Sequence, residues 1–230
     1  MNKSLDSKRS LCIFGGLAGA VGVVLLGLSF AINTGPPPNP TRAELVKFGQ
    51  DNYAKILWGA WLQAVGPVLI VLFAFSLVHL ARATQRLAGW MTFFGATILM
   101  TVSLVEIIFY ISALHTDPAV MPYISLVLIS AVQHLYFIVT APSLFFPLGI
   151  VLLGSAVLPR AFGYLALVLA GVFAVLGATF MLRLILPNYV TAFAGVQALW
   201  WLAAAISLIS RRGSSSESEN RNQPMMEKAV

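Results

Sequence analysis

The stretch MPYISLVLISAVQHLYFIVTAPSLFFPLGIVLLGSAVL, residues 121–158, is apolar over about 38 positions and decides how the chain is arranged. A helix needs about 20 apolar residues to cross a bilayer, so this stretch could hold two tight crossings or one long, broken crossing. The two alternatives place all later segments on opposite sides of a membrane. The distribution of basic residues distinguishes between them.

The chain as a whole is too apolar for a water-soluble protein. Of its 230 residues, 59% are hydrophobic and 10% are charged, and the mean hydropathy is +0.87. So few charged side chains cannot coat a soluble domain of this size. The sequence therefore predicts an all-α polytopic membrane helix bundle with the lipid bilayer as its main partner.

Six transmembrane helices are predicted, at about residues 11–32, 56–79, 89–114, 121–158, 162–186 and 189–209. They form a transmembrane domain over residues 11–210, between an N-terminal segment, residues 1–10, and a disordered tail, residues 211–230. The first stretch follows basic residues as a signal peptide would. Its roughly 20 apolar residues exceed the usual 7–15, so we expect an uncleaved helix, with removal of residues 1–31 as the alternative.

The basic residues favour one crossing within residues 121–158, because lysine and arginine concentrate in cytoplasmic loops. With one crossing, both termini and ten of the 14 basic residues face the cytoplasm. These ten are Lys3, Lys8, Arg9, Arg82, Arg86, Arg160, Arg211, Arg212, Arg221 and Lys228. With two crossings, Arg160 and the Arg211-Arg212 pair would move outside. Pro142 and Pro147 predict a bend in this fourth helix.

Residues 33–55 form the predicted external loop, which holds Arg42, Lys47 and Lys55. Four prolines between residues 36 and 40 make its first part an extended linker. Thr41 and Glu44 have the spacing of a capping box. The apolar residues that follow predict a short amphipathic helix at the membrane surface.

Several classes of function lack their sequence signatures. The basic residues are scattered and form no nucleic-acid-binding face. No phosphate-binding loop, dinucleotide fingerprint or hydrolase motif is present. The three histidines, His79, His115 and His134, lie on different segments, and Cys12 is the single cysteine. We therefore predict no catalytic set, no metal site and no cofactor.

Small residues recur at helical spacing in two predicted spans. They are Gly15, Gly19 and Gly22 in the first span and Ala170, Ala174 and Ala178 in the fifth. Such residues let helix backbones approach closely. They could form a homo-oligomer interface or pack inside one bundle, and we favour packing inside the bundle.

Polar side chains within the spans gather in the outer half of the predicted bundle. They are Gln63, Glu106, Gln133, His134, Arg183 and Gln197. Ionisable groups in lipid cost several kcal/mol unless they are paired or face a cavity. We expect Glu106 to pair with Arg183. The cluster is either a structural set of interhelical hydrogen bonds or an outward-facing pocket for a small polar or amphiphilic ligand.

Two other functional readings stay open at this point. One is a membrane-embedded enzyme that uses Glu106 or His134 as acid or base, and the other is an accessory membrane subunit. The segment HLARATQRLAGW, residues 79–90, precedes the span that bears Glu106. With the six-span plan, it makes residues 10–210 resemble uncharacterised small bacterial six-helix multi-pass membrane proteins of a domain-of-unknown-function type. The resemblance implies a bacterial inner membrane and no particular activity.

Overall fold

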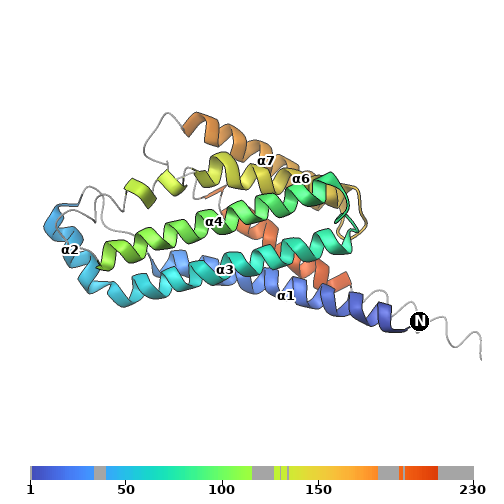
Figure 1. Ribbon diagram of the computed structural model, residues 1–230, viewed down its shortest axis with the longest axis horizontal. Coiled ribbons are helices and arrows are strands. Elements are labelled where there is room, and N and C mark those ends of the chain that lie inside the picture. Colours follow the sequence, from blue (N-terminus) through green and yellow to red (C-terminus); the bar gives the residue numbers. More distant parts are fainter. Residues whose placement is uncertain are drawn as a thin grey trace, which may run out of the picture.

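The computed structural model describes residues 2–33, 40–115, 127–129, 131–133, 135–180, 192–193 and 195–211, without the side chains of residues 2–7, 115 and 180. Its elements are α1 (Asn2–Ile32), α2 (Arg42–Asp51), α3 (Tyr53–Leu80), α4 (Leu87–His115), η1 (Tyr136–Thr140), α6 (Ala141–Leu153) and α7 (Arg160–Phe180). Figure 1 shows them as an elongated helical bundle. This confirms the predicted all-α membrane fold.

Five described helices are long and apolar enough to cross a membrane. They are Lys8–Ile32, Tyr53–Leu80, Leu87–Leu114, Val127–Leu153 and Arg160–Thr179. Residues 195–211 are also helical. The sixth crossing, at residues 189–209, and the cytoplasmic termini remain predictions, because residues 181–191 and most of the tail lie outside the described part.

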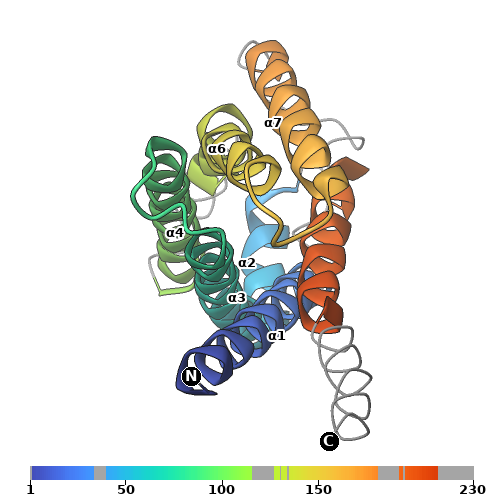
Figure 2. The same cartoon turned by 90° about the vertical axis from the view of Figure 1, so that its right-hand side faces the viewer.

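Successive long helices run in opposite directions along the bundle (Figure 1). We call the end that carries α2 the α2 end, and the end that carries the loops 81–86 and 154–159 the arginine end. Arg211 donates from Nη1 to the carbonyl oxygen of Ala156, which places the end of the last described helix at the arginine end. Figure 2, looking along the bundle, shows α1 between α3 and this last helix.

The glycines of the first span pack inside the bundle, as we favoured. A Cβ atom added at Gly22 would lie 2.8 Å from the carbonyl oxygen of Gly66 on α3. At Gly19 it would lie 2.6 Å from the ring of Phe73. Of the three small residues named in the fifth span, Ala170 is buried, and Ala174 and Ala178 are exposed. The expectation was wrong for these two alanines, because they lie on the face of α7 that points away from the bundle.

Val127–Leu153 is one candidate membrane span, as the basic residues favoured for residues 121–158. Its irregularity begins before Pro142, where Tyr136–Thr140 forms a π-helical turn. The N–H of Ala141 bonds to the carbonyl of Tyr136, five residues back. This wider turn makes room for the Pro142 ring, which would clash with the preceding turn of a regular α-helix.

The fourth helix ends at Leu153 and not at residue 158 as predicted. Gly154 caps it by donating its N–H to the carbonyl of Ile150 at 3.0 Å. The Ser155 hydroxyl bonds to the carbonyl of Leu152 at 3.3 Å. A glycine cap followed by a serine that bonds back to the last turn stops the helix although the sequence stays apolar.

Helix α2 begins with the capping box expected from its sequence. The backbone N–H of Thr41 donates to Glu44 Oε2 at 2.7 Å, and the Thr41 hydroxyl accepts from the N–H of Glu44 at 3.4 Å. Leu45 is buried. The predicted short helix and its capping box are thus confirmed, and its position at the membrane surface stays a prediction.

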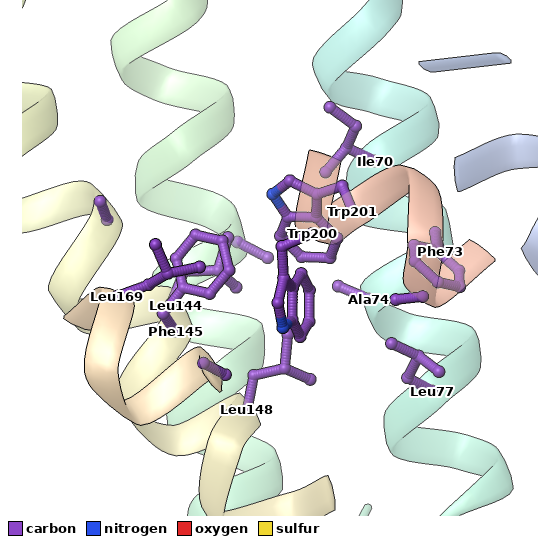
Figure 3. Close-up of a cluster of buried hydrophobic side chains, with 14 of the residues drawn as sticks. Ile70, Phe73, Ala74, Leu77, Leu144, Phe145, Leu148, Leu169, Trp200 and Trp201 are labelled. Atoms are coloured by element: carbon purple, nitrogen blue, oxygen red, sulfur yellow. The ribbon is translucent and has the colours of Figure 1, made fainter. Parts of the chain in front are cut away.

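An aromatic cluster joins the last described helix to the rest of the bundle (Figure 3). Trp201 contacts Phe73 of α3 and Phe145 of α6, with ring centroids 5.9 and 5.2 Å apart. Trp200 also contacts Phe145 and donates its indole N–H to the carbonyl of Phe162 on α7 at 3.1 Å. Because lipid is as apolar as this core, close packing and the indole hydrogen bond hold the helix, rather than exclusion of water.

Candidate functional site

Glu106 lies at the centre of a buried polar cluster. Its Oε2 accepts a hydrogen bond from Nε2 of Gln63 on α3 at 2.6 Å. Its Oε1 accepts from Nε2 of Gln133 at 3.0 Å. Glu106 is 7% exposed and Gln63 is 4% exposed. The sequence predicted that these three side chains would share a cluster, and the structure brings them together from three helices.

The cluster lies in the half of the bundle nearer to α2. Glu106 is nine residues before the end of α4, and Gln63 is ten residues after the start of α3. At 1.5 Å per residue these positions are about 13–15 Å from the helix ends. Gln63 and Glu106 therefore lie in the same half of the bundle.

A second hydrogen-bonded pair extends the polar region to the last described helix. The hydroxyl of Tyr136 donates to Oε1 of Gln197 at 2.6 Å. Tyr136 follows Gln133 by three residues, so the two pairs occupy neighbouring turns of the same segment. Polar contacts therefore connect α3, α4, residues 131–136 and residues 195–211.

Tyr136 was missed by the sequence analysis. Its position within a predicted span could have drawn attention to it, because tyrosines of membrane proteins concentrate at the two membrane interfaces. A tyrosine deep within a span needs a partner for its hydroxyl. Gln197 is that partner.

Thr140 carries a buried hydroxyl that has no hydrogen-bond partner. Its side chain is 0% exposed, and its Oγ1 is the one such atom found in the described part of the chain. A threonine in a regular α-helix can bond back to the carbonyl four residues earlier, here that of Tyr136. That carbonyl instead accepts from Ala141 in the π-helical turn. An unpaired hydroxyl at this depth fits a bound water or a polar ligand atom.

No family model, curated protein or solved structure matches the chain.

Two residues of the predicted cluster, His134 and Arg183, lie outside the described residues. Their approach to Glu106 stays a prediction. Among the described side chains, no group of three histidine, cysteine, aspartate or glutamate residues could hold a metal ion.

The arrangement can form hydrogen bonds and hold charge, but it does not resemble a familiar catalytic set. Both oxygens of Glu106 accept bonds from neutral amides. Each glutamine amide also has a carbonyl oxygen that can accept a hydrogen bond. A carboxylate flanked by amide oxygens suits a positively charged group or several hydrogen-bond donors.

Proposed function

We propose that the protein is a non-enzymatic multi-pass membrane protein that binds a small polar or amphiphilic ligand at the Glu106 cluster, as a step in sensing or transport. The observation that carries the proposal is a nearly buried carboxylate that is held by two amides from two other helices. Ionisable residues at membrane depth are costly, and they mark ligand and ion sites. The unpaired hydroxyl of Thr140 provides further hydrogen-bonding capacity seven residues from Gln133.

The ligand would enter from the α2 end, which we assign to the outside. The distribution of basic residues supports this orientation. The resemblance noted above supports a bacterial inner membrane. In a Cys12→Ser background, cysteines at Asn39 and Asp117 should react with an impermeant reagent from outside intact cells. Cysteines at Gln85 and Ser215 should not, and labelling of Ser215→Cys from outside would reverse the assignment.

Ligand occupancy can be tested by native mass spectrometry of the full chain extracted in mild detergent. We expect an adduct in the wild type that denaturation releases as a small molecule, and its loss in Glu106→Leu. Thr101→Val is the matched control, because Thr101 is exposed on the same helix and its hydroxyl bonds to the carbonyl of Thr97. Absence of an adduct from the wild type, or its retention in Glu106→Leu, would reject the proposal.

A structural role in an accessory subunit is the second candidate, because both carboxylate oxygens of Glu106 are already hydrogen-bonded. Under that role the cluster joins three helices and binds nothing else. The variant Gln63→Leu/Glu106→Leu/Gln133→Leu separates the two functions. An apolar cluster that folds stably but has lost the adduct supports ligand binding, whereas failure to fold together with an adduct-free wild type supports the structural role.

A further inference from the structure

The turn between α3 and α4 places an arginine where a glycine is normally found. The N–H of Ala83 bonds to the carbonyl of Val78, and the N–H of Arg82 bonds to that of His79, both at 3.0 Å. These two bonds define a Schellman motif with Arg82 at its left-handed position. Arg82 has a φ of 52°, and it is the one non-glycine residue with positive φ among the described backbone.

Glycine avoids the steric cost of this conformation, and asparagine reduces it, whereas arginine bears it fully. Strained backbone positions are often functional. The Arg82 side chain is exposed, so it does not offset this cost by packing in the core. We infer that its charge is needed at this place.

Further arginines meet at the same end of the bundle. Nη1 of Arg86 lies 3.6 Å from the position that a Cβ atom would take on Gly154, so it reaches the loop 154–159. Arg211 bonds to the carbonyl of Ala156 in the same loop. Arg160 directly follows this loop as the first residue of α7. Within the described part of the chain, no carboxylate pairs with Arg82, Arg86 or Arg160.

The exposed aromatic residues place these arginines at the depth of lipid headgroups. Trp90 follows Arg86, which directly precedes α4, by four residues, and Tyr164 follows Arg160, the first residue of α7, by four. Each ring therefore lies about one turn further along its helix than its arginine. Trp90 is 62% exposed and Tyr164 is 60% exposed. Tryptophan and tyrosine in such positions occupy the boundary between headgroups and acyl chains. Their neighbouring arginines are then at the level of lipid phosphates.

We propose that the arginine end is a binding site for the phosphate of an anionic phospholipid, formed by Arg82, Arg86 and Arg160. Arginine suits this ligand because its planar group can give two parallel hydrogen bonds to a phosphate. The aromatic side chains one turn deeper would contact the upper part of the acyl chains. This geometry favours a lipid over a soluble phosphate, which would have no use for the apolar surface.

The test is titration of the full chain in detergent with phosphatidylglycerol and with phosphatidylcholine, with bound lipid counted by native mass spectrometry. We expect preferential binding of phosphatidylglycerol that weakens with salt. A charge near the headgroup surface contributes about 1 kcal/mol, so Arg82→Gly and Arg86→Gln should each lower the affinity about fivefold. Arg82→Gly should at the same time leave the lipid-free Tm unchanged or raise it, because glycine fits the turn better.

Lys47→Gln is the matched control, because Lys47 is an exposed cation at the α2 end. It should bind phosphatidylglycerol as the wild type does. The proposal is overturned if Arg82→Gly keeps wild-type affinity, if it lowers the lipid-free Tm, or if Lys47→Gln loses as much affinity. Glycerol phosphate should not displace the lipid at equal concentration. If it does, the ligand of the site is a soluble phosphate ester and the lipid proposal is overturned.

Discussion

The amide nitrogen Nε2 of Gln63 lies 2.6 Å from the carboxylate oxygen Oε2 of Glu106, although 43 residues separate the two in sequence. The contact joins α3 to α4 where both side chains are buried. Replacing either residue with an apolar one leaves a buried polar atom of the other residue without its hydrogen-bond partner. This makes the pair suitable for a double-mutant cycle.

Gln63→Leu and Glu106→Leu should each lower the free energy of unfolding by about 1–3 kcal/mol, because each leaves a buried polar group unpaired. The double variant should lose less than the sum, with a coupling of about 0.6–1.7 kcal/mol, as for hydrogen bonds between membrane helices. The measurement is reversible unfolding in mixed micelles. Strict additivity would show that the contact contributes nothing.

Gly22 and Gly27 provide a matched test of the packing between α1 and α3. A Cβ atom at Gly22 would lie 2.8 Å from the carbonyl oxygen of Gly66 and 3.0 Å from the backbone nitrogen of Ile70. Neither backbone atom can move without shifting a helix, so Gly22→Ala should destabilise the fold by about 1–3 kcal/mol.

Gly27 has nothing within 4 Å of the same position. Gly27→Ala should therefore be neutral or stabilising by up to about 1 kcal/mol, because alanine is the better helix former. Thermal unfolding of both variants in one detergent checks the difference. Equal effects would contradict the close approach of α1 and α3.

The sequence contained enough information to predict the five candidate spans found among the described residues, because bilayer thickness fixes their length and polar residues interrupt them. It also indicated the Glu106 cluster, since a carboxylate and amides stand out in an apolar helix. It could not show which face of each helix points inward. Phe73 is 0% exposed and Phe75 is 37% exposed on the same helix. Lipid and protein interior are equally apolar, so hydropathy does not separate the two rings.

The π-helical turn and the hydrogen bond from Tyr136 to Gln197 could not be predicted from the sequence for a related reason. Pro142 shows that the helix must deviate, but it does not fix whether the helix bends after the proline or widens before it. The close approach of a neighbouring helix helps to define where the wider turn forms. Gly177 of α7 packs on the turn, and its added Cβ atom would be 2.7 Å from the Cα of Ile138. Such contacts depend on tertiary structure.

Stability of the first turn of α2 should depend on pH through Glu44. The backbone N–H and the hydroxyl of Thr41 hydrogen-bond to its carboxylate and lower the pKa of Glu44 below its ordinary value. A lowered pKa in the folded state means that the contribution is complete above the ordinary glutamate pKa. It is lost as the pH falls through the lowered, folded value.

Hydrogen exchange of the amides of residues 44–50 measures this effect. The ratio of protection between wild type and Glu44→Gln should be largest near neutral pH and approach one in acid. Lys47→Gln, on the same helix, should show a protection ratio to the wild type that does not change over this range. A Glu44→Gln ratio that is independent of pH would refute the role of the capping box.

The expected pairing of Glu106 with Arg183 gains a geometrical argument from the described residues. Gly177 of α7 packs against Ile138, and α7 runs antiparallel to residues 127–153 (Figure 1). Gln133, five residues before Ile138, is bonded to Glu106 at 3.0 Å. The last described turns of α7 therefore run towards the level of the carboxylate. Arg183 lies outside the described residues, and its pairing with Glu106 stays a prediction.

If the two groups pair, Glu106→Gln and Arg183→Gln should each destabilise the protein in detergent, by about 3–5 kcal/mol for a fully buried pair. The double variant should lose less than the sum. The losses of stability caused by Arg183→Gln and Thr101→Val should be additive, because the Thr101 hydroxyl bonds within its own helix. Additivity of Glu106→Gln with Arg183→Gln, or a separation above about 8 Å in an experimental structure, would reject the pairing, since direct ion pairs act over about 4–6 Å. Glu106 would then lack Arg183 as a partner and could receive a cationic group of a ligand, which favours binding over a structural role.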